Sequence, residues 1–409
     1  MASDALHPHT RRAPARPVHA LMLEPGELTD ALVATWASGA AAAVLPVRSS
    51  PTERAQLLAL LRPAQLVTRG ADGSLARQKL PDAVPVSAEV ALLVATSGST
   101  GARKAVALTQ AALQASVDAS LARLGARRGE RWGLVLPTHH IAGLSVLLRA
   151  RALGTDAVVA SDAASLLRTR VEHVSLVPTQ LADLLERGVP LDHPRTILLG
   201  GARPDPVLLQ RAREAGARVV VSYGMTETVG GCVYDGVPLD GVEVAVTVEG
   251  RIRLRGPVLL HSYRTPDPAG GVHDRPAVDP DGWFTTSDLG YLVDGVLTVT
   301  GRADDVLISG GVNVPLAAVQ AAVASHPQVA EAAVTAVADP RWGEVPAAVV
   351  VPSDPAAPPT LAAVRAHVKA RAPAAYAPRH LVLVAQLPRD GLGKVPRSAL
   401  DALVRDAGS

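Results

Sequence analysis

Short apolar runs alternate with longer segments of helical periodicity through the first three quarters of the chain, and few folds accommodate that order. Apolar runs bounded by polar or glycine-rich stretches are typical of buried strands. Strands that alternate with helices favour a parallel α/β sheet. We expect strands at residues 91–95, 133–136, 157–160, 173–177, 196–199 and 218–222, and helices at residues 110–124 (N-cap Thr109), 178–186 and 206–215.

The pattern changes after residue 237, where shorter β-like runs are separated by glycine and proline. These runs, at residues 242–248, 251–254 and 296–299, predict a β-rich annex. After Gly301, helices are expected near residues 315–325 and 361–372, and strands near residues 329–338, 347–351 and 380–384. The expected fold class is α/β: a large N-terminal domain of layered α/β subdomains with a β-rich annex, plus a small α+β C-terminal domain.

Composition narrows the functional classes. The chain has 409 residues, more than one core usually serves, which predicts two domains. Lys and Arg number 40 against 38 Asp and Glu, a net charge of +2 that gives no reason to expect nucleic-acid binding. The longest apolar run, residues 40–47, is too short to cross a bilayer, so no membrane insertion is expected.

Two further features concern the environment of the protein. The first twenty residues contain arginines, histidines and prolines and precede no apolar stretch, so we expect a loosely packed start and no signal peptide. The only cysteine, Cys232, is expected to be a buried apolar side chain and not a catalytic thiol. A reducing cytoplasm fits this composition.

A segment rich in Ser, Gly and Thr, residues 96–104, directly follows the expected strand at 91–95 and precedes the helix at 110–124. Glycines there let backbone N–H groups face an anion, and hydroxyls and Lys104 add hydrogen bonds and charge. The segment is no Walker A loop, because Gly98 and Gly101 are too close and an arginine precedes Lys104. A flexible Ser/Gly turn is the alternative.

Three more clusters follow along the chain. Residues 222–227 close an expected strand and combine an aromatic ring, a hydroxyl and a carboxylate. The ring could stack on a nucleotide base, and the hydroxyl with the carboxylate could hold Mg²⁺ beside phosphates. Asp288, which suits two vicinal ribose hydroxyls, precedes Arg302 by fourteen residues, and residues 393–397 are basic. Taken singly, these clusters could be a strand-end turn, a surface Asp-Gly turn and a basic surface turn.

In this order, the four clusters resemble the family of acyl-CoA synthetases, amino-acid adenylation domains and luciferases, over about residues 40–401. Two more segments carry the resemblance, residues 200–202 and residues 339–344. It implies phosphate binding by Thr96, Ser97, Gly98, Ser99, Thr100, Gly101 and Lys104; adenine contacts from Gly200, Gly201, Ala202 and Tyr223; further ATP binding by Gly224 and Met225; Mg²⁺ binding by Glu227 and Thr100; and ribose contacts from Asp288 and Arg302.

The resemblance also implies a mechanism and a division of the chain. Thr226, Glu227 and His140 would serve catalysis, and Lys394 would bridge the substrate carboxylate and the α-phosphate of ATP. A carboxylate is already a nucleophile and mainly needs alignment and charge neutralisation at phosphorus. The implied domains are residues 1–302 and a mobile small domain, residues 306–409, joined by a hinge at residues 303–305.

Thioester formation in this family follows rotation of the small domain, here about Asp304. Gly310 and Gly311 would then line the channel of coenzyme A, although a strand-end turn is the ordinary alternative. ATP and Mg²⁺ are the implied cofactors, with coenzyme A as co-substrate. The expected partners are therefore these molecules and a small carboxylic acid, and the state of assembly, including a homodimer, stays open.

A short region before residue 90, together with residues 137–144 and 227–236, resembles the o-succinylbenzoate–CoA ligases of menaquinone biosynthesis. The resemblance places His140, Gly201 and Gly231 beside the acid, and Arg149 at a position where this subfamily carries an arginine. That substrate has a second, unreactive carboxylate, which a guanidinium would bind well. A surface arginine on an amphipathic helix is the competing interpretation of Arg149.

Two other functions stay open. One is a ligase of the same mechanism for an aryl or fatty acid, with coenzyme A or a carrier protein as acceptor; an amino-acid adenylation domain is disfavoured because residues 137–143 lack the aspartate that would meet an α-amine. The other is a nucleotide-binding regulator without catalysis, against which Lys394, Glu227 and Asp304 argue.

Overall fold

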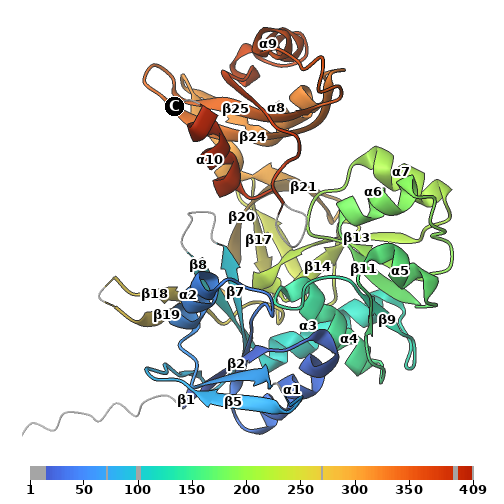
Figure 1. The fold of residues 1–409 in the computed structure, drawn as a ribbon, viewed down its shortest axis with the longest axis vertical. Coiled ribbons are helices and arrows are strands. Elements are labelled where there is room, and N and C mark those ends of the chain that lie inside the picture. Colours follow the sequence, from blue (N-terminus) through green and yellow to red (C-terminus); the bar gives the residue numbers. More distant parts are fainter. Residues whose placement is uncertain (1–14, 71, 98–102, 269, 390–394, 408–409) are drawn as a thin grey trace, which may run out of the picture. The chain divides into compact units, whose positions relative to one another are not determined.

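The computed structural model describes residues 15–407 except residues 71, 98–102, 269 and 390–394. The chain divides into two compact units, which Figure 1 shows in ribbon form. The first unit comprises Met1–Glu243 and Arg255–Phe284, and the second comprises Val244–Leu254 and Thr285–Ser409. Each unit is described by itself below.

The first unit contains two large mixed sheets. Among the described residues, the N-terminal sheet has the strand order β19 (Val272–Pro276), β18 (Ser262–Pro266), β8 (Arg103–Thr109), β7 (Val90–Ser97), β3 (Ala41–Val44), β2 (Val18–Met22), β4 (Gln65–Arg69) and β5 (Leu75–Lys79). The central sheet has the order β10 (Val158–Val159), β9 (Trp132–Leu134), β11 (His173–Leu176), β12 (Thr196–Leu199), β13 (Val219–Met225), β14 (Gly230–Tyr234) and β15 (Val237–Pro238). A short pair joins β1 (Ala15–Arg16) and β6 (Val86–Ser87).

Helices cover these sheets in layers. The helices of the first unit are α1 (Pro25–Ala37), α2 (Pro51–Leu61), α3 (Gln110–Leu124), α4 (Ile141–Ala152), α5 (Ala163–Arg168), α6 (Pro178–Glu186) and α7 (Pro206–Glu214). Apolar side chains of α2 pack on the N-terminal sheet, and those of α5 and α6 pack on the central sheet. Helix α3 contacts strands of both sheets and therefore lies between them. The predicted layered α/β architecture is confirmed.

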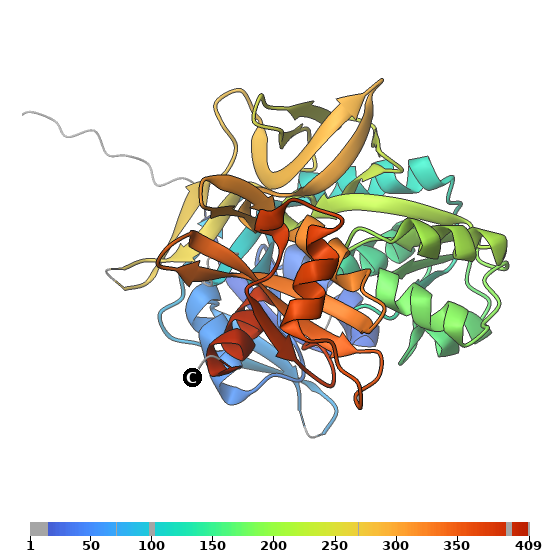
Figure 2. The same ribbon diagram turned by 90° about the horizontal axis from the view of Figure 1, so that it is seen from above.

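The second unit is built on two smaller sheets. In the described part of the chain, one has the order β16 (Glu243–Val246), β17 (Arg251–Arg255), β20 (Phe284–Val293) and β21 (Val296–Arg302), and the other joins β23 (Val312–Pro315), β22 (Val306–Ser309), β25 (Gly343–Pro352), β24 (Val329–Asp339) and β26 (His380–Leu383). Its helices are α8 (Leu316–Ala324), α9 (Leu361–Lys369) and α10 (Arg397–Ala407), with one-turn helices η2 (Ala303–Asp305) and η3 (Ala374–Tyr376). Helices α8 and α9 pack on one face of the β24–β25 pair and α10 packs on the other (Figure 2).

Several sequence expectations can be compared with these elements. The hydroxyl of Thr109 accepts a hydrogen bond from the amide of Ala112, so the predicted N-cap of α3 is confirmed. Cys232 is fully buried, as expected, and burial raises the pKa of its thiol to about 12. The expectation of a loosely packed start is wrong for Val18 and Ala20, which are buried in β2 between β3 and β4.

The N-terminal sheet was not anticipated before residue 90, and it is mixed where a parallel sheet was expected. Parallel pairs join β2, β3, β4 and β7, whereas β5, β8, β18 and β19 are antiparallel to their neighbours. No helix in the described ranges is both long and apolar enough to span a membrane.

Candidate active site

Three polar side chains meet in the first unit: Lys104 of β8, Glu227 of the one-turn helix η1 (Thr226–Thr228) and Tyr263 of β18. The Lys104 Nζ atom lies 3.0 Å from Glu227 Oε1, and the Tyr263 hydroxyl donates to the same oxygen at 2.7 Å. Lys104 Nζ also lies 3.7 Å from the centroid of the Tyr263 ring, a cation–π contact. A cation and a half-buried carboxylate therefore lie together where a metal–polyphosphate complex would need both.

The predicted phosphate loop lies between β7 and β8. Thr96 is paired with Lys104 across these antiparallel strands, and the Thr96 hydroxyl donates to the Lys104 carbonyl oxygen at 3.4 Å. The buried apolar residues 105–108 continue as a strand against β7, and the expected helix α3 begins after them at Gln110. Ser97 ends β7; the other predicted residues, Gly98, Ser99, Thr100 and Gly101, lie outside the described residues.

The predicted adenine-binding residues and the neighbouring Gly224 and Met225 lie at the carboxyl ends of β12 and β13, which are adjacent and parallel. Gly200, Gly201 and Ala202 follow β12, and Tyr223, Gly224 and Met225 end β13. Gly201 has φ +88°, and a Cβ atom at Gly224 would lie 2.0 Å from the carbonyl oxygen of Gly230. Both positions therefore need glycine. Open α/β sheets bind ligands at this edge, which agrees with the prediction, while the base contacts themselves stay a prediction.

The turn that follows Glu227 has an unusual backbone. Val229 has φ +55°, a conformation that β-branched residues rarely adopt. Its carbonyl oxygen accepts hydrogen bonds from the hydroxyls of Ser116 on α3 and Ser145 on α4, both at 3.3 Å. The hydroxyl of Thr228 closes the same turn through main-chain bonds of 2.6 and 3.0 Å. These contacts tie η1, and so the main chain of Glu227, to helices α3 and α4.

Arg149 of α4 is only 3% exposed, so its interpretation as a surface arginine is wrong. Its guanidinium donates to the Tyr234 hydroxyl at 3.4 Å and lies 5.1 Å from the Trp132 ring. The Nε atom has no hydrogen-bond partner, and no Asp or Glu of the described residues forms an ion pair with Arg149. The helix therefore buries a positive charge without an anionic partner from the described part of the chain.

Two other predicted acid-binding residues lie near Arg149 in the fold: Gly231 is on β14 with Tyr234, and His140 directly precedes α4, the helix of Arg149. A Cβ atom at Gly231 would lie 2.8 Å from the Tyr234 ring, so the main chain of Gly231 runs beside the residue that contacts Arg149. His140 is the N-cap residue of α4, and its ring centroid lies 4.3 Å from that of His139. Burial lowers the pKa of His139, which favours a neutral ring.

The predicted ribose pair lies in the second unit. Asp288 of β20 faces Arg302 of β21, and their side chains form an ion pair at 3.0 Å. A second nitrogen of Arg302 lies 3.0 Å from a carboxylate oxygen of Asp304, the predicted hinge residue in η2. Arg397 donates to the Asp304 carbonyl oxygen at 2.7 Å. The structure thus joins the predicted ribose and hinge residues in one charged network.

The predicted residues of the coenzyme A channel form the turn between β22 and β23. Gly310 and Gly311 have φ +57° and +82°, which explains glycine at both. A Cβ atom at Gly310 would lie 2.5 Å from the Trp342 ring, whereas the corresponding position at Gly311 is open. Lys394, the predicted catalytic lysine, lies outside the described residues.

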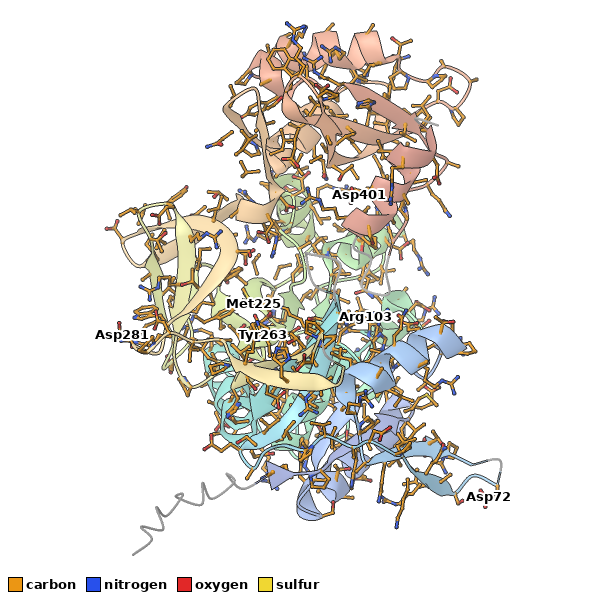
Figure 3. The ribbon with its side chains drawn as sticks, turned by 90° about the vertical axis from the view of Figure 1, so that its left-hand side faces the viewer. Asp72, Arg103, Met225, Tyr263, Asp281 and Asp401 are labelled. Carbon is orange, nitrogen blue, oxygen red and sulfur yellow. The ribbon has the colours of Figure 1, made fainter. Side chains whose placement is uncertain are left out.

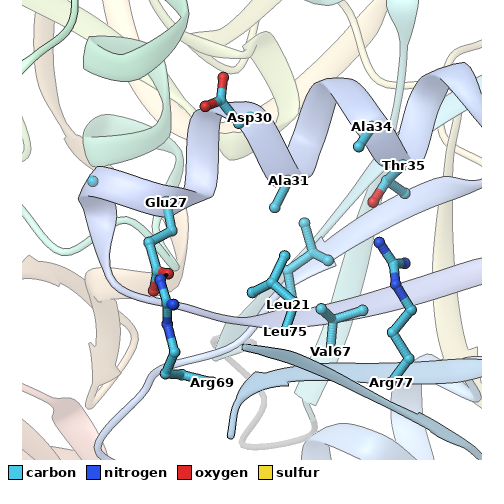
Figure 4. Close-up of a pocket in the computed structure, with 11 residues that line it drawn as sticks. Leu21, Glu27, Asp30, Ala31, Ala34, Thr35, Val67, Arg69, Leu75 and Arg77 are labelled. Carbon is cyan, nitrogen blue, oxygen red and sulfur yellow. Dashed lines mark ion pairs between the residues drawn. The ribbon is translucent and has the colours of Figure 1, made fainter. Parts of the chain in front are cut away.

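A cavity of about 380 Å³ lies elsewhere in the first unit, between α1 and the β4–β5 hairpin. Figure 4 shows its apolar floor, which includes Leu21 and Val67, and the Arg69–Glu27 ion pair at one end. None of the predicted site residues lines this cavity. It is therefore no part of the candidate active site.

The donors of this site that the structure describes fit Mg²⁺. Within the described ranges, no three His, Cys, Asp or Glu side chains gather as a metal site. Magnesium is commonly bound by one or two carboxylates together with substrate phosphates and water. The Glu227 carboxylate with the neighbouring Thr226 hydroxyl matches that pattern in chemistry.

Two known protein families match this chain. The model of the AMP-binding enzyme family matches residues 73–263, and that of the AMP-binding enzyme C-terminal domain matches residues 318–394. The chain belongs to the family of AMP-binding enzymes. It is similar to a probable 2-succinylbenzoate–CoA ligase of Mycobacterium tuberculosis, with 42% identity over 84% of this chain and 94% of that protein.

Solved structures show the same relationship. The o-succinylbenzoate CoA synthetase of Bacillus subtilis in complex with the acyl-adenylate intermediate OSB-AMP is 30% identical, with a TM-score of 0.79 over 96% of this chain and 89% of that one. The same enzyme in complex with ATP and magnesium ion also has a TM-score of 0.79, with 30% identity over 96% and 90% of the two chains. The family resemblance and the fold class drawn from the sequence motifs are both confirmed.

Proposed function

We propose that this chain is an ATP-dependent acid–thiol ligase that converts o-succinylbenzoate to o-succinylbenzoyl-CoA through an acyl-AMP intermediate, with release of pyrophosphate and AMP. The names of its relatives support the substrate, and the bound molecules in the Bacillus subtilis structures support ATP, Mg²⁺ and the adenylate. One observation on this chain carries the substrate proposal furthest: the buried charge of Arg149, which has no anionic partner among the described residues.

A buried charge without a partner is unfavourable, because it loses its hydration and gains no compensating attraction. Arg149 is buried on α4, and among the described residues its guanidinium has polar or cation–π contacts with the Tyr234 hydroxyl and the Trp132 ring, and with no carboxylate. An anionic group of the substrate would supply the attraction that the buried guanidinium otherwise lacks. A substrate with two carboxylates can place one at Arg149 while the other reacts, whereas a fatty acid or benzoate has no second carboxylate.

The proposed adenylation step uses the cluster at Glu227. A carboxylate oxygen of the acid forms a bond to the α-phosphorus of ATP, and the bond from that phosphorus to the departing pyrophosphate breaks. Lys104 contributes positive charge at the phosphates, and Lys394 would align the two reacting groups. Mg²⁺, when bound by Glu227, would neutralise phosphate charge.

The remaining roles are proposed on the same basis. Asp288 and Arg302 would take the ribose, and Tyr223 would stack on adenine. Rotation about Asp304, within the hinge at residues 303–305, would bring the turn of Gly310 and Gly311 to the thiol of coenzyme A. We place the enzyme in the cytoplasm, where its single cysteine would stay reduced, and a homodimer is compatible with the proposal.

An ATP–pyrophosphate exchange assay over a panel of acids tests the proposal. The panel contains o-succinylbenzoate, benzoate, a fatty acid and an analogue of o-succinylbenzoate that lacks the aromatic carboxylate. We expect exchange with o-succinylbenzoate to exceed the others and coenzyme A to convert the adenylate to a thioester. Preference for benzoate or a fatty acid would refute the substrate, and absence of exchange with every acid would refute the ligase.

A further inference from the structure

We propose that Tyr263 is a positioning residue whose hydroxyl holds the Glu227 carboxylate in the orientation that receives Mg²⁺ with the polyphosphate. The inference rests on the proposed function, in which Glu227 serves the metal. No sequence motif pointed to Tyr263, which lies 36 residues beyond Glu227 and reaches it only through the fold. Figure 3 labels Tyr263 among the side chains of the first unit.

The two oxygens of the Glu227 carboxylate have different surroundings. Oε1 accepts from the Tyr263 hydroxyl at 2.7 Å and lies 3.0 Å from Lys104 Nζ. Both side-chain hydrogen bonds of Glu227 in the described part of the protein go to Oε1, and none goes to Oε2. The Glu227 side chain is 12% exposed, so water reaches it only in part. One oxygen is thus held by the protein while the other is left for a ligand.

Lys104 cannot be the permanent holder of Glu227 if it also serves the phosphates. Its side chain is flexible and 31% exposed, so it can leave Glu227 when a polyphosphate arrives. Tyr263 cannot move in this way, because β18 pairs with β8 on one side and β19 on the other. The next residue, Arg264, is fully buried and bonded to three main-chain carbonyls and Asp274. The hydroxyl of Tyr263 is therefore the fixed contact.

A neutral donor suits this task better than a cation does. The Tyr263 hydroxyl donates a hydrogen bond to Glu227 Oε1 and brings no charge of its own. A neutral hydroxyl orients the carboxylate and leaves its negative charge available to a metal ion. A permanent ion pair at the same oxygen would cancel much of that charge. Outer contacts of this kind commonly change metal affinity or activity by about 10- to 100-fold.

Tyr263→Phe tests the proposal, since it removes the hydroxyl and keeps the ring that Lys104 contacts. Tyr291→Phe is the matched control, because Tyr291 is half exposed on β20. Titration calorimetry measures ATP affinity in EDTA and in Mg²⁺. We expect ATP affinity in EDTA to stay within about 2-fold for both variants, and the gain in affinity caused by Mg²⁺ to fall about 10-fold in Tyr263→Phe alone.

The exchange assay gives a second readout. The Mg²⁺ concentration at half-maximal exchange should rise about 10-fold in Tyr263→Phe, with the KM for the acid unchanged. An unchanged Mg²⁺ gain, or an equal loss of affinity with and without Mg²⁺, would overturn the proposal. Glu227→Gln distinguishes failure of the Tyr263 proposal from failure of the proposed function. If Mg²⁺ raises the ATP affinity of this variant as much as that of the wild type, Glu227 does not bind the metal and the role of Tyr263 is refuted. Exchange by the wild type would still support the ligase.

Discussion

Replacing Arg149 by methionine removes the buried charge of α4 and keeps most of the side-chain volume. If the guanidinium binds the unreactive carboxylate of the acid, the variant loses a charge-assisted hydrogen bond of about 1.5–3 kcal/mol. The KM for o-succinylbenzoate should therefore rise about 10- to 100-fold. The KM for ATP should hardly change, because Lys104 and Glu227 lie on other elements.

The same substitution, which should weaken binding of the acid, should stabilise the ligand-free protein. Arg149 has no anionic partner among the described residues, and replacing an uncompensated buried charge by an apolar side chain stabilises a protein. The Tyr234 hydroxyl keeps Ser120 as a partner at 2.7 Å, so the change leaves no new unsatisfied group there. We expect the free energy of unfolding to rise by on the order of 1 kcal/mol.

Thermal unfolding without ligand and steady-state exchange kinetics measure the two effects. Arg151→Met is the matched control, because Arg151 is exposed on the same helix, and it should alter neither quantity beyond about 0.5 kcal/mol. The analogue without the aromatic carboxylate completes a double-mutant cycle, in which Arg149→Met should weaken this analogue little. Loss of stability together with equal weakening of both acids would show a structural arginine and refute the reasoning.

Three further outcomes are expected. Lys394→Ala should slow acyl-AMP formation by on the order of 10²-fold but spare thioester formation from supplied acyl-AMP; equal loss in both half-reactions would contradict domain alternation. Asp304→Pro, which fixes φ near −65°, should leave adenylation nearly normal and impair thioester formation, and normal turnover would remove Asp304 from the hinge. Arg264→Met should lower the free energy of unfolding by about 3–5 kcal/mol in urea titrations. The control variant Arg275→Met, at an exposed position, should lower it by less than about 0.5 kcal/mol. A small effect at Arg264 would show that its buried hydrogen bonds and ion pair contribute little to stability.

The local parts of the site could be predicted, because short spacings fix them. The cap at Thr109, the strand β13 and the turn with Glu227 each depend on neighbours in sequence, and the motifs located them. The apolar run after the phosphate loop was harder to assign. Residues 105–108 carry no strand prediction, and only pairing with β7 shows that they belong to β8.

Contacts between distant segments could not be predicted. Lys104 and Glu227 are separated by 123 residues, and nothing local at Tyr263 distinguishes it from an ordinary strand tyrosine. The burial of Arg149 depends on β14 and on Trp132, which come from other elements. Position in the fold, and not residue type, decides whether an arginine on an amphipathic pattern faces water or the interior.

The place of β18 next to β8 has a consequence during synthesis. Strand β8 ends at Thr109 and its partner β18 begins at Ser262, so roughly 150 residues must be translated between them. At about 5–20 residues per second, the apolar edge of β8 waits roughly 8 to 30 s for that partner. An unpaired apolar edge is a template for wrong pairing with another chain. We therefore expect fragments that stop before residue 262 to aggregate, because they lack the partner of β8.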